Sequence, residues 1–303
     1  RLSLAGGINN IGTTIGPILV SLAIFGSIAA GQKLENLESV KIPYLILGAA
    51  FVVAAIIFKF SSLPNQIILK EETQISDTAK ENLSSRKSAL SYPQLWLGMI
   101  GIFVYVGVEV STASNLPEFM RVHLGTQTNQ IAPFVSLFWA SLMIGRWISA
   151  VDVFDFRKGI KQILSFLLPY CAFGVFLLIN KLANYDVTPF YVYVIIIVAI
   201  IFANIFSRGN PTRQLVIFSL CGIVSLLIGI FADGIISVYA FISVGLFCST
   251  LWPCIFTLAI AGLGKHTNEG SSFLIMMIMG GGFISLLQGW LAKDNLLGIQ
   301  WSY

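Results

Sequence analysis

Glu109 has the clearest capacity for chemistry, because its carboxyl stands within a long apolar run around residues 100–112. A charge at the centre of a bilayer costs about 2.5–3.5 kcal/mol on insertion scales, so a membrane-spanning run would need a reason to carry it. At about 100° per residue, Tyr105 and Thr112 share the face of Glu109 on a helix. Such a stripe could carry a proton or bind the hydroxyl groups of a substrate. The alternative is a structural hydrogen bond to another helix.

Two adjacent amides, Asn9 and Asn10, lie in a second apolar run. Helical spacing places Asn9 on one face with Thr13 and Gly16. Gly12 and Gly16 are spaced as small residues are where two membrane helices approach closely. Asn9 is therefore either a ligand contact or a tie between helices.

Two later runs combine helix-breaking residues with polar or aromatic side chains. Pro253 follows Trp252 in mid-run, which predicts a bend that lines a cavity, and Trp252 could stack on the apolar face of a ring. The triplet Gly280–Gly282 predicts close contact or motion, and Ser285 shares a face with Gln288, a candidate hydrogen-bond donor. Core packing explains Trp252 and Gln288 equally well.

Arg146 stands near one end of its apolar run and is followed by Asp152 and Asp155. We interpret this group as a charge clamp that gates one side of a helical bundle. Simple snorkelling of the Arg146 side chain to the membrane surface is the alternative.

The elements that must position these residues are membrane helices. Hydrophobic residues make up 56% of the 303 residues, charged residues 11%, and the mean hydropathy is +0.84; soluble domains carry about 25% charged residues. The four cysteines lie in apolar runs and are expected to be buried. A bilayer-spanning helix needs about 20 mostly apolar residues. Such runs are found at 8–30, 43–61, 94–122, 131–153, 161–180, 189–206, 213–231, 235–263 and 270–292.

The connections between these runs predict two bundles and their sidedness. Residues 63–93 form the one long polar connection, which we interpret as a cytoplasmic linker between the last two helices of an N-terminal bundle (1–62) and a C-terminal bundle (94–303). Lys and Arg are concentrated on the side that holds this linker, which is therefore cytoplasmic. This orientation places Lys80 in the cytoplasm and Asn36 on the opposite side of the membrane. One side carries Arg1, Lys59, Lys70, Lys80, Arg86, Lys87, Arg157, Lys158, Lys161, Arg208, Arg213 and Lys265, and the other carries Lys33, Lys41, Arg121, Lys181 and Lys293.

Among functional classes, secondary transport fits this inventory best. The chain has no HExxH, GxSxG or CxxC motif and no histidine within a predicted span, so a membrane enzyme is not expected. A channel would need a carbonyl filter or a ring of charge. Bent helices around a few polar groups at mid-membrane are typical of secondary transporters.

Several segments together resemble the fucose–galactose–glucose:proton symporter family of the major facilitator superfamily, with the bacterial glucose/galactose permeases most similar. They are Asn9–Pro17, Tyr105–Ser111, Met143–Arg146, Trp252–Ile260, Gly270–Phe273 and Gly280–Gly282. The resemblance implies an all-α fold in which the first run is the fifth helix of a twelve-helix plan, so that four helices would precede it and one would follow the ninth run. Two extra helices around 189–231 would fit between the eighth and tenth.

The resemblance also implies a function. The protein would import a hexose of the glucose/galactose type by cation symport with alternating access, with H⁺ favoured over Na⁺. Asn9, Glu109, Trp252 and Gln288 would bind the sugar, Glu109 would also carry the proton, and Arg146 would gate. A fucose or N-acetylhexosamine permease, or an uncoupled channel, is the alternative.

Further expectations concern partners and location. We expect no cofactor, metal or nucleic acid, a monomer surrounded by lipid, and the bacterial inner membrane. Two departures from the family pattern stand out. Fucose permeases carry an amide at the position of Glu109, and Cys248 stands where the family often has Asn.

Overall fold

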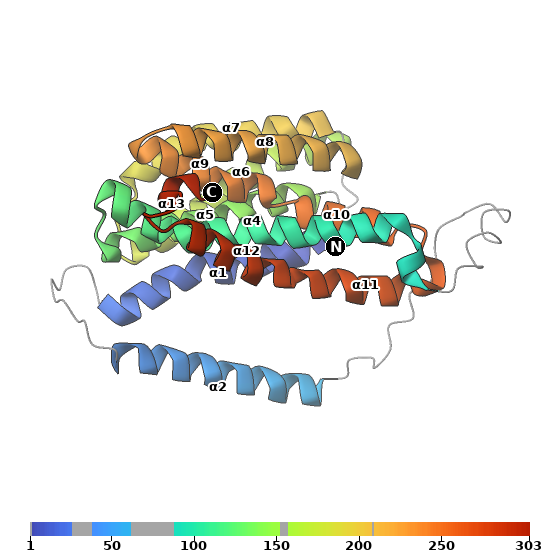
Figure 1. The fold of residues 1–303 in the computed structure, drawn as a ribbon, viewed down its shortest axis with the longest axis horizontal. Helices are drawn as coiled ribbons and strands as arrows, with labels where there is room; N and C mark the ends of the chain where they lie inside the picture. Colours follow the sequence, from blue (N-terminus) through green and yellow to red (C-terminus); the bar gives the residue numbers. More distant parts are fainter. Residues whose placement is uncertain (1, 26–37, 62–87, 152–156, 208) are drawn as a thin grey trace.

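The computed structural model describes residues 2–25, 38–61, 88–151, 157–207 and 209–303. All regular elements in these ranges are helices, as the apolar runs predict, and Figure 1 shows them running roughly side by side. The longer helices are α1 (Leu2–Phe25), α2 (Glu38–Phe60), α4 (Pro93–Leu124), α5 (Thr128–Ala150), α6 (Lys158–Leu182), α7 (Tyr193–Ser207), α8 (Pro211–Phe231), α9 (Gly234–Cys248), α10 (Leu251–Ile260), α11 (Thr267–Met276) and α12 (Gly280–Leu291).

Short elements join them: the 3₁₀ turns η2 (Ala89–Ser91), η4 (Thr188–Val192), η5 (Gly264–His266) and η6 (Met277–Met279), and the single turn α13 (Gly298–Trp301). Seven segments of the described chain are long and apolar enough to cross a membrane, and all of them lie between residues 93 and 291. With α1 and α2, they correspond to the nine runs of the sequence.

The chain alternates between the two ends of the bundle. In Figure 1, η2 and the α10–α11 connection lie at the right, whereas the α4–α5 connection lies at the left. This is the up-and-down order expected for successive membrane spans. Which end faces the cytoplasm stays a prediction, and its two reporter positions, Lys80 and Asn36, lie outside the described residues.

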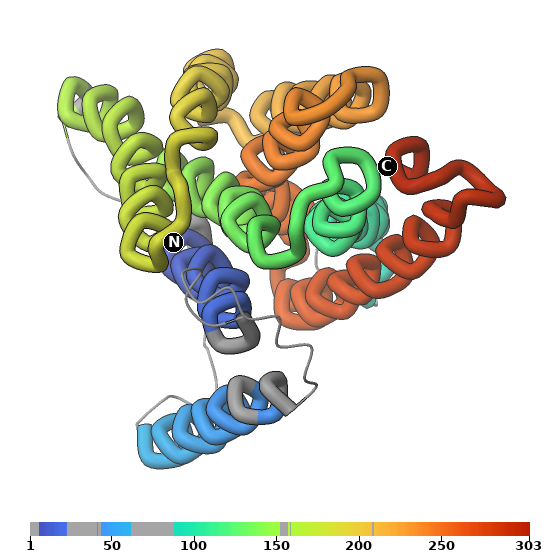
Figure 2. The backbone as a smooth tube through the Cα atoms, turned by 90° about the vertical axis from the view of Figure 1, so that its left-hand side faces the viewer, coloured from blue at the N-terminus to red at the C-terminus, as the bar shows by residue number. Residues whose placement is uncertain are grey.

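Helices α4, α5 and α9 supply most of the buried core, with α6, α7 and α8 packed around them (Figure 2). Helix α1 packs along α5, whereas α2 lies apart and leaves its apolar side chains exposed, such as Phe51 and Phe58. The division into residues 1–62, 63–93 and 94–303 stays a prediction, since most of the linker lies outside the described residues.

Two membrane segments are interrupted in the middle. The α9–α10 segment breaks at Ser249 and Thr250, just before Pro253, which confirms the bend predicted there. A proline in the first turn of a helix leaves no intrahelical hydrogen bond unmade, so α10 can start afresh at this point. The α11–α12 segment passes through η6 immediately before the three glycines.

The glycine triplet makes the close contact that its sequence predicts. A Cβ at Gly280 would lie 2.1 Å from the Phe103 carbonyl oxygen of α4, whereas a Cβ at Gly282 would meet nothing within 4 Å. Gly12 and Gly16 make no such contact among the described residues, so the close approach that their spacing allows stays a prediction.

The close approach of α1 to α5 is made instead at Gly6 and Gly7, which pack on the side chains of Arg146 and Trp147. The cysteines also differ from expectation in part. Cys248 and Cys254 are buried, but Cys171 is exposed and Cys221 is half-buried, because their apolar runs turn those faces outward.

A substitution at this contact tests the packing. We expect Gly280→Val to prevent normal folding, because the obstructing atom belongs to the backbone of α4 and cannot rotate away. Overpacking of this kind costs about 1–3 kcal/mol or more. The measurement is the yield of monodisperse protein and its thermal midpoint in detergent. Gly282→Val, two residues further on, is the matched control, and equal losses in the two variants would contradict the contact.

Candidate functional site

The Glu109 carboxylate accepts a hydrogen bond from the Tyr105 hydroxyl, one turn earlier on α4. Tyr105 is buried and Glu109 is half-buried. The positive charge of Arg146, on α5, acts on the same carboxylate. The predicted stripe is therefore formed in part, with Tyr105 and Glu109 in direct contact.

Arg146 joins three helices at this level. Its Nε donates to the Ser249 carbonyl oxygen at 3.1 Å, and its Nη1 donates to the Asn10 Oδ1 at 3.1 Å and to the Gly6 carbonyl oxygen at 3.4 Å. The Ser249 carbonyl is available because α9 ends there. The guanidinium, whose fork carries several donors, thus ties α1 to the break between α9 and α10.

The predicted charge clamp around Arg146 stays a prediction. Asp152 and Asp155 lie outside the described residues, and the recorded partners of Arg146 are carbonyl and amide oxygens. The guanidinium therefore acts between helices, at the side of α1, rather than only at the bundle end.

Of the two neighbouring amides in α1, the structure buries Asn10 and exposes Asn9. The Asn10 side chain turns its Oδ1 to Arg146 and leaves its buried Nδ2 without a hydrogen-bond partner among the described residues. Asn9 was the sequence-predicted ligand. The sequence signal for Asn10 is its helical phase, because the polar residues Thr14 and Ser21 follow it on the same face of a helix. The structure buries all three side chains.

Trp252 stands in the first turn of α10 and is half-buried. Its ring stacks on Phe256, with centroids 5.0 Å apart and planes 21° apart. One face of the indole is therefore already covered by this chain, so a ligand ring would have to use the other face.

Gln288 is buried on α12 and is paired with Asn115 of α4, a residue that sequence reasoning missed. The Asn115 Nδ2 donates at 2.9 Å to the Ser111 carbonyl oxygen and at 2.9 Å to the Gln288 Oε1. A carbonyl can only accept, which fixes the orientation of both amides. The Gln288 Nε2 is left without a partner among the described residues.

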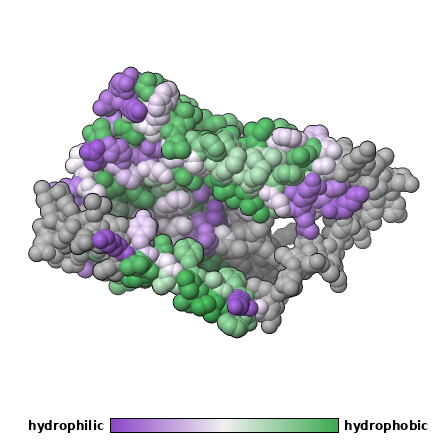
Figure 3. Space-filling view, turned by 60° about the horizontal axis from the view of Figure 1, so that its bottom comes forward, coloured by the Kyte–Doolittle hydropathy of each residue, from purple (hydrophilic) through white to green (hydrophobic). Residues whose placement is uncertain are grey.

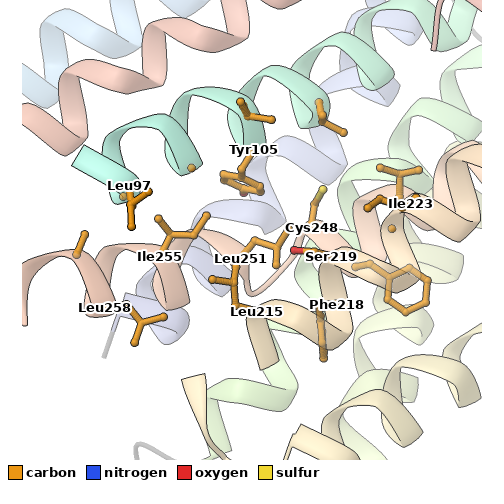
Figure 4. Close-up of a pocket in the computed structure, with 18 of the residues that line it drawn as sticks. Leu97, Tyr105, Leu215, Phe218, Ser219, Ile223, Cys248, Leu251, Ile255 and Leu258 are labelled. Carbon is orange, nitrogen blue, oxygen red and sulfur yellow. The ribbon is translucent and has the colours of Figure 1, made fainter. Parts of the chain in front are cut away.

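Gln288 lines a cavity of about 130 Å³, together with Ser111, Thr112 and the C-terminal Tyr303. A larger cavity of about 560 Å³ lies between α4, α8, α9 and α10, and Figure 4 shows Tyr105 and Cys248 at its wall with leucine and isoleucine side chains around it. Neither cavity is lined by Asn9, Glu109 or Trp252. Of the four predicted sugar contacts, Gln288 alone lines one of these two cavities.

Polar groups also lie together on the face of the molecule that Figure 3 draws. Figure 3 shows hydrophilic side chains within a recess between mainly apolar helices. In the described residues, no group of three or more His, Cys, Asp or Glu side chains could hold a metal ion. The chemistry available here is hydrogen bonding, charge pairing and proton binding at Glu109.

Comparisons with known proteins identify relatives along the whole chain. No family model matches it. The glucose/galactose transporter of Brucella abortus (biovar 1, strain 9-941) is 31% identical over 307 aligned residues, covering 100% of this chain and 59% of the relative. The putative glucose/galactose transporter of Helicobacter pylori (strain 26695) is 28% identical, covering 95% of this chain and 57% of the relative. The L-fucose-proton symporter of Escherichia coli K12 is 36% identical over 86 residues, which are 28% of this chain and 20% of the relative.

The fold is also found in a solved structure. The crystal structure of FucP, a major facilitator superfamily transporter in the outward conformation, matches with a TM-score of 0.59 and 20% identity, over 100% of this chain and 63% of that chain. The chain thus spans about three fifths of the length of the full-length relatives that it matches. All of these relatives are named as transporters. The matches confirm the resemblance seen in the sequence: along its whole length this chain is similar to bacterial proteins named as glucose/galactose transporters, and it shares the fold of the major facilitator superfamily transporter FucP.

Proposed function

We propose that the protein imports a hexose of the glucose/galactose type by proton symport, working by alternating access in the bacterial inner membrane. The observation that carries this proposal is the group formed by Tyr105, Glu109 and Arg146. A carboxylate that accepts from a tyrosine and lies within the electrostatic influence of an arginine can take up and release a proton as its neighbours move. The names of the relatives supply the substrate class and the coupling ion.

In this proposal the site residues have distinct roles. Asn9 contacts the sugar from α1, and Glu109, Trp252 and Gln288 contact it from the second bundle. Glu109 also carries the proton, and Arg146 gates. Asn9 and Glu109 are accessible in part, as a ligand contact requires. Rocking of one bundle against the other would close α1 and the second bundle around the sugar.

The deciding experiment is uptake into membrane vesicles with a panel of labelled sugars. Under an imposed pH gradient, we expect saturable accumulation of glucose or galactose that an uncoupler abolishes. Accumulation driven by a Na⁺ gradient alone would show that the coupling ion is Na⁺ rather than H⁺. Preferential transport of fucose or an N-acetylhexosamine over glucose and galactose would assign a different substrate to the protein. The partial match to the fucose symporter makes fucose the first sugar to compare. Flux that rises linearly with concentration would indicate a channel and overturn the proposal.

The role of Trp252 has a matched control on α4. We expect Trp252→Ala to raise the KM for sugar about fivefold or more, since loss of a stacking platform costs about 1–3 kcal/mol in other systems. Trp96 is exposed in the first turn of α4, where its Nε1 donates to the Leu90 carbonyl oxygen at 2.9 Å. Trp96→Ala should therefore leave the KM unchanged. Equal KM values in the two variants, at equal expression, would remove Trp252 from the site.

A further inference from the structure

The outer end of α1 is held to the second bundle by a separate contact. The hydroxyls of Ser21 and Tyr185 lie 2.7 Å apart, and both side chains are buried. Around them a small hydrophobic cluster, separate from the main core, includes Ile18 and Ala183. We call these four residues the outer clamp.

The loop that carries Tyr185 is tightly built. Asn184 has φ +63°, the only positive φ outside glycine in the described chain, and the Tyr185 N–H donates to the Asn180 carbonyl oxygen at 3.0 Å. The next turn is fixed by the Thr188 N–H, which donates to the Asp186 carboxylate at 2.9 Å. Asp186 lies between the predicted spans, and its hydrogen bonds from the Thr188 side chain and backbone lower its pKa. The carboxylate that organises this turn is therefore charged at neutral pH.

The outer clamp is one of three levels at which α1 is held. At the opposite end, Arg146 and Trp147 donate to carbonyl and amide oxygens of α1. In the middle, the Ser136 hydroxyl donates to the Thr14 carbonyl oxygen at 2.7 Å. A helix that rocks against its neighbour can keep the middle contact as a pivot, but its two ends must separate in turn.

We propose that the outer clamp is the extracytoplasmic gate of the transport cycle, with the Ser21–Tyr185 hydrogen bond holding it closed. This inference rests on the alternating-access part of the proposed function. It gives Tyr185 a role opposite in direction to that of Arg146: weakening Tyr185 favours the outward-open state, and weakening Arg146 favours the inward-open state. Both contacts are formed in the structure described here.

Accessibility of a reporter cysteine tests the gate without any sugar. Ala183→Cys places a small thiol inside the clamp, and Cys171 and Cys221 are replaced by serine because they are exposed or half-buried. Intact cells that express the protein are treated with a membrane-impermeant maleimide. A buried hydrogen bond contributes about 0.5–1.5 kcal/mol. We therefore expect Tyr185→Phe, which removes only the hydroxyl, to raise the labelling rate about twofold to tenfold.

Further variants test the expected direction of each change in labelling rate. Ser21→Ala should raise labelling as Tyr185→Phe does, and the double variant should add nothing, because both remove the same bond. Arg146→Met should lower labelling. Tyr191→Phe, on an exposed tyrosine, is the matched control. The inference is overturned by unchanged labelling in folded Tyr185→Phe protein, or by shifts of the same direction in the Tyr185 and Arg146 variants.

The labelling assay also separates this inference from the proposed function. If no sugar is taken up but labelling responds as expected, the gate stands and the substrate proposal fails. If sugar is taken up and labelling does not respond, the gate alone fails. Thermal midpoints of the purified variants identify a protein that has simply unfolded, and for such a variant the Ser21→Ala result decides.

Discussion

Glu109→Gln should lose concentrative sugar uptake by about tenfold or more while keeping the shape of the side chain. The change removes the charge that Tyr105 donates to and that the charge of Arg146 influences, and a hydrogen bond to a charged group contributes about 1.5–3 kcal/mol. If Glu109 carries the proton, the pH dependence of uptake should flatten, whereas sugar counterflow should survive because it needs no net proton movement. If Glu109 contacts the sugar, preference should also move toward fucose, since fucose permeases resemble this chain with an amide at that position.

The measurement is pH-dependent uptake and counterflow, both expressed per folded molecule. Glu118→Gln is the control, because Glu118 lies on the same helix but is exposed and paired with Arg121 at 2.5 Å. A purely structural role for Glu109 predicts a different result. The Glu109→Gln protein would then be less abundant or less thermally stable, but the surviving molecules would keep the same sugar preference and pH profile.

Arg146→Met should produce the second large effect, a loss of uptake of about tenfold or more accompanied by a lower thermal midpoint. The substitution leaves the Ser249 carbonyl and the Asn10 amide oxygen without this donor, and it removes an additional donor from the Gly6 carbonyl, which lies within α1. Each buried acceptor left unsatisfied costs about 1–3 kcal/mol. It also leaves Glu109 without its neighbouring positive charge.

Lysine at the same position refines this prediction. An ammonium is a single point of charge and cannot reproduce the donor fork of a guanidinium, so Arg146→Lys should retain the charge effect on Glu109 but only part of the stability. Arg213→Met, at an exposed arginine, should change neither quantity. Full activity and stability of Arg146→Met would show that the three contacts contribute nothing.

The helices themselves could be predicted from the sequence because the bilayer restricts what a spanning segment can be. Runs of about 20 apolar residues mark their positions. Pro253 marks the break between α9 and α10, because a proline cannot continue the hydrogen-bond ladder. The close approach at Gly280 was also predictable, since a run of glycines destabilises a helix unless a neighbour comes near.

The contacts of the site were much less predictable. Asn9 and Asn10 differ by only about 100° around α1, and the helical phase that Asn10 shares with Thr14 and Ser21 is a weak signal of the face that meets α5. Gln288 and Asn115 are 173 positions apart, so their pairing has no sequence signal. The break before Pro253 could be located from the sequence. The sequence did not indicate that Arg146 would bind the carbonyl freed at Ser249.

The way α1 is held bears on how the protein is made. Its partners follow it in the chain by 122 to 164 positions, a distance that a ribosome covers in about 6 to 33 seconds at about 5–20 residues per second. During that interval α1 enters the bilayer with Asn10, Thr14 and Ser21 unpartnered by α5 or by the loop of Tyr185. Biogenesis of this protein therefore requires that a nascent helix with polar side chains be sheltered until its late partners arrive.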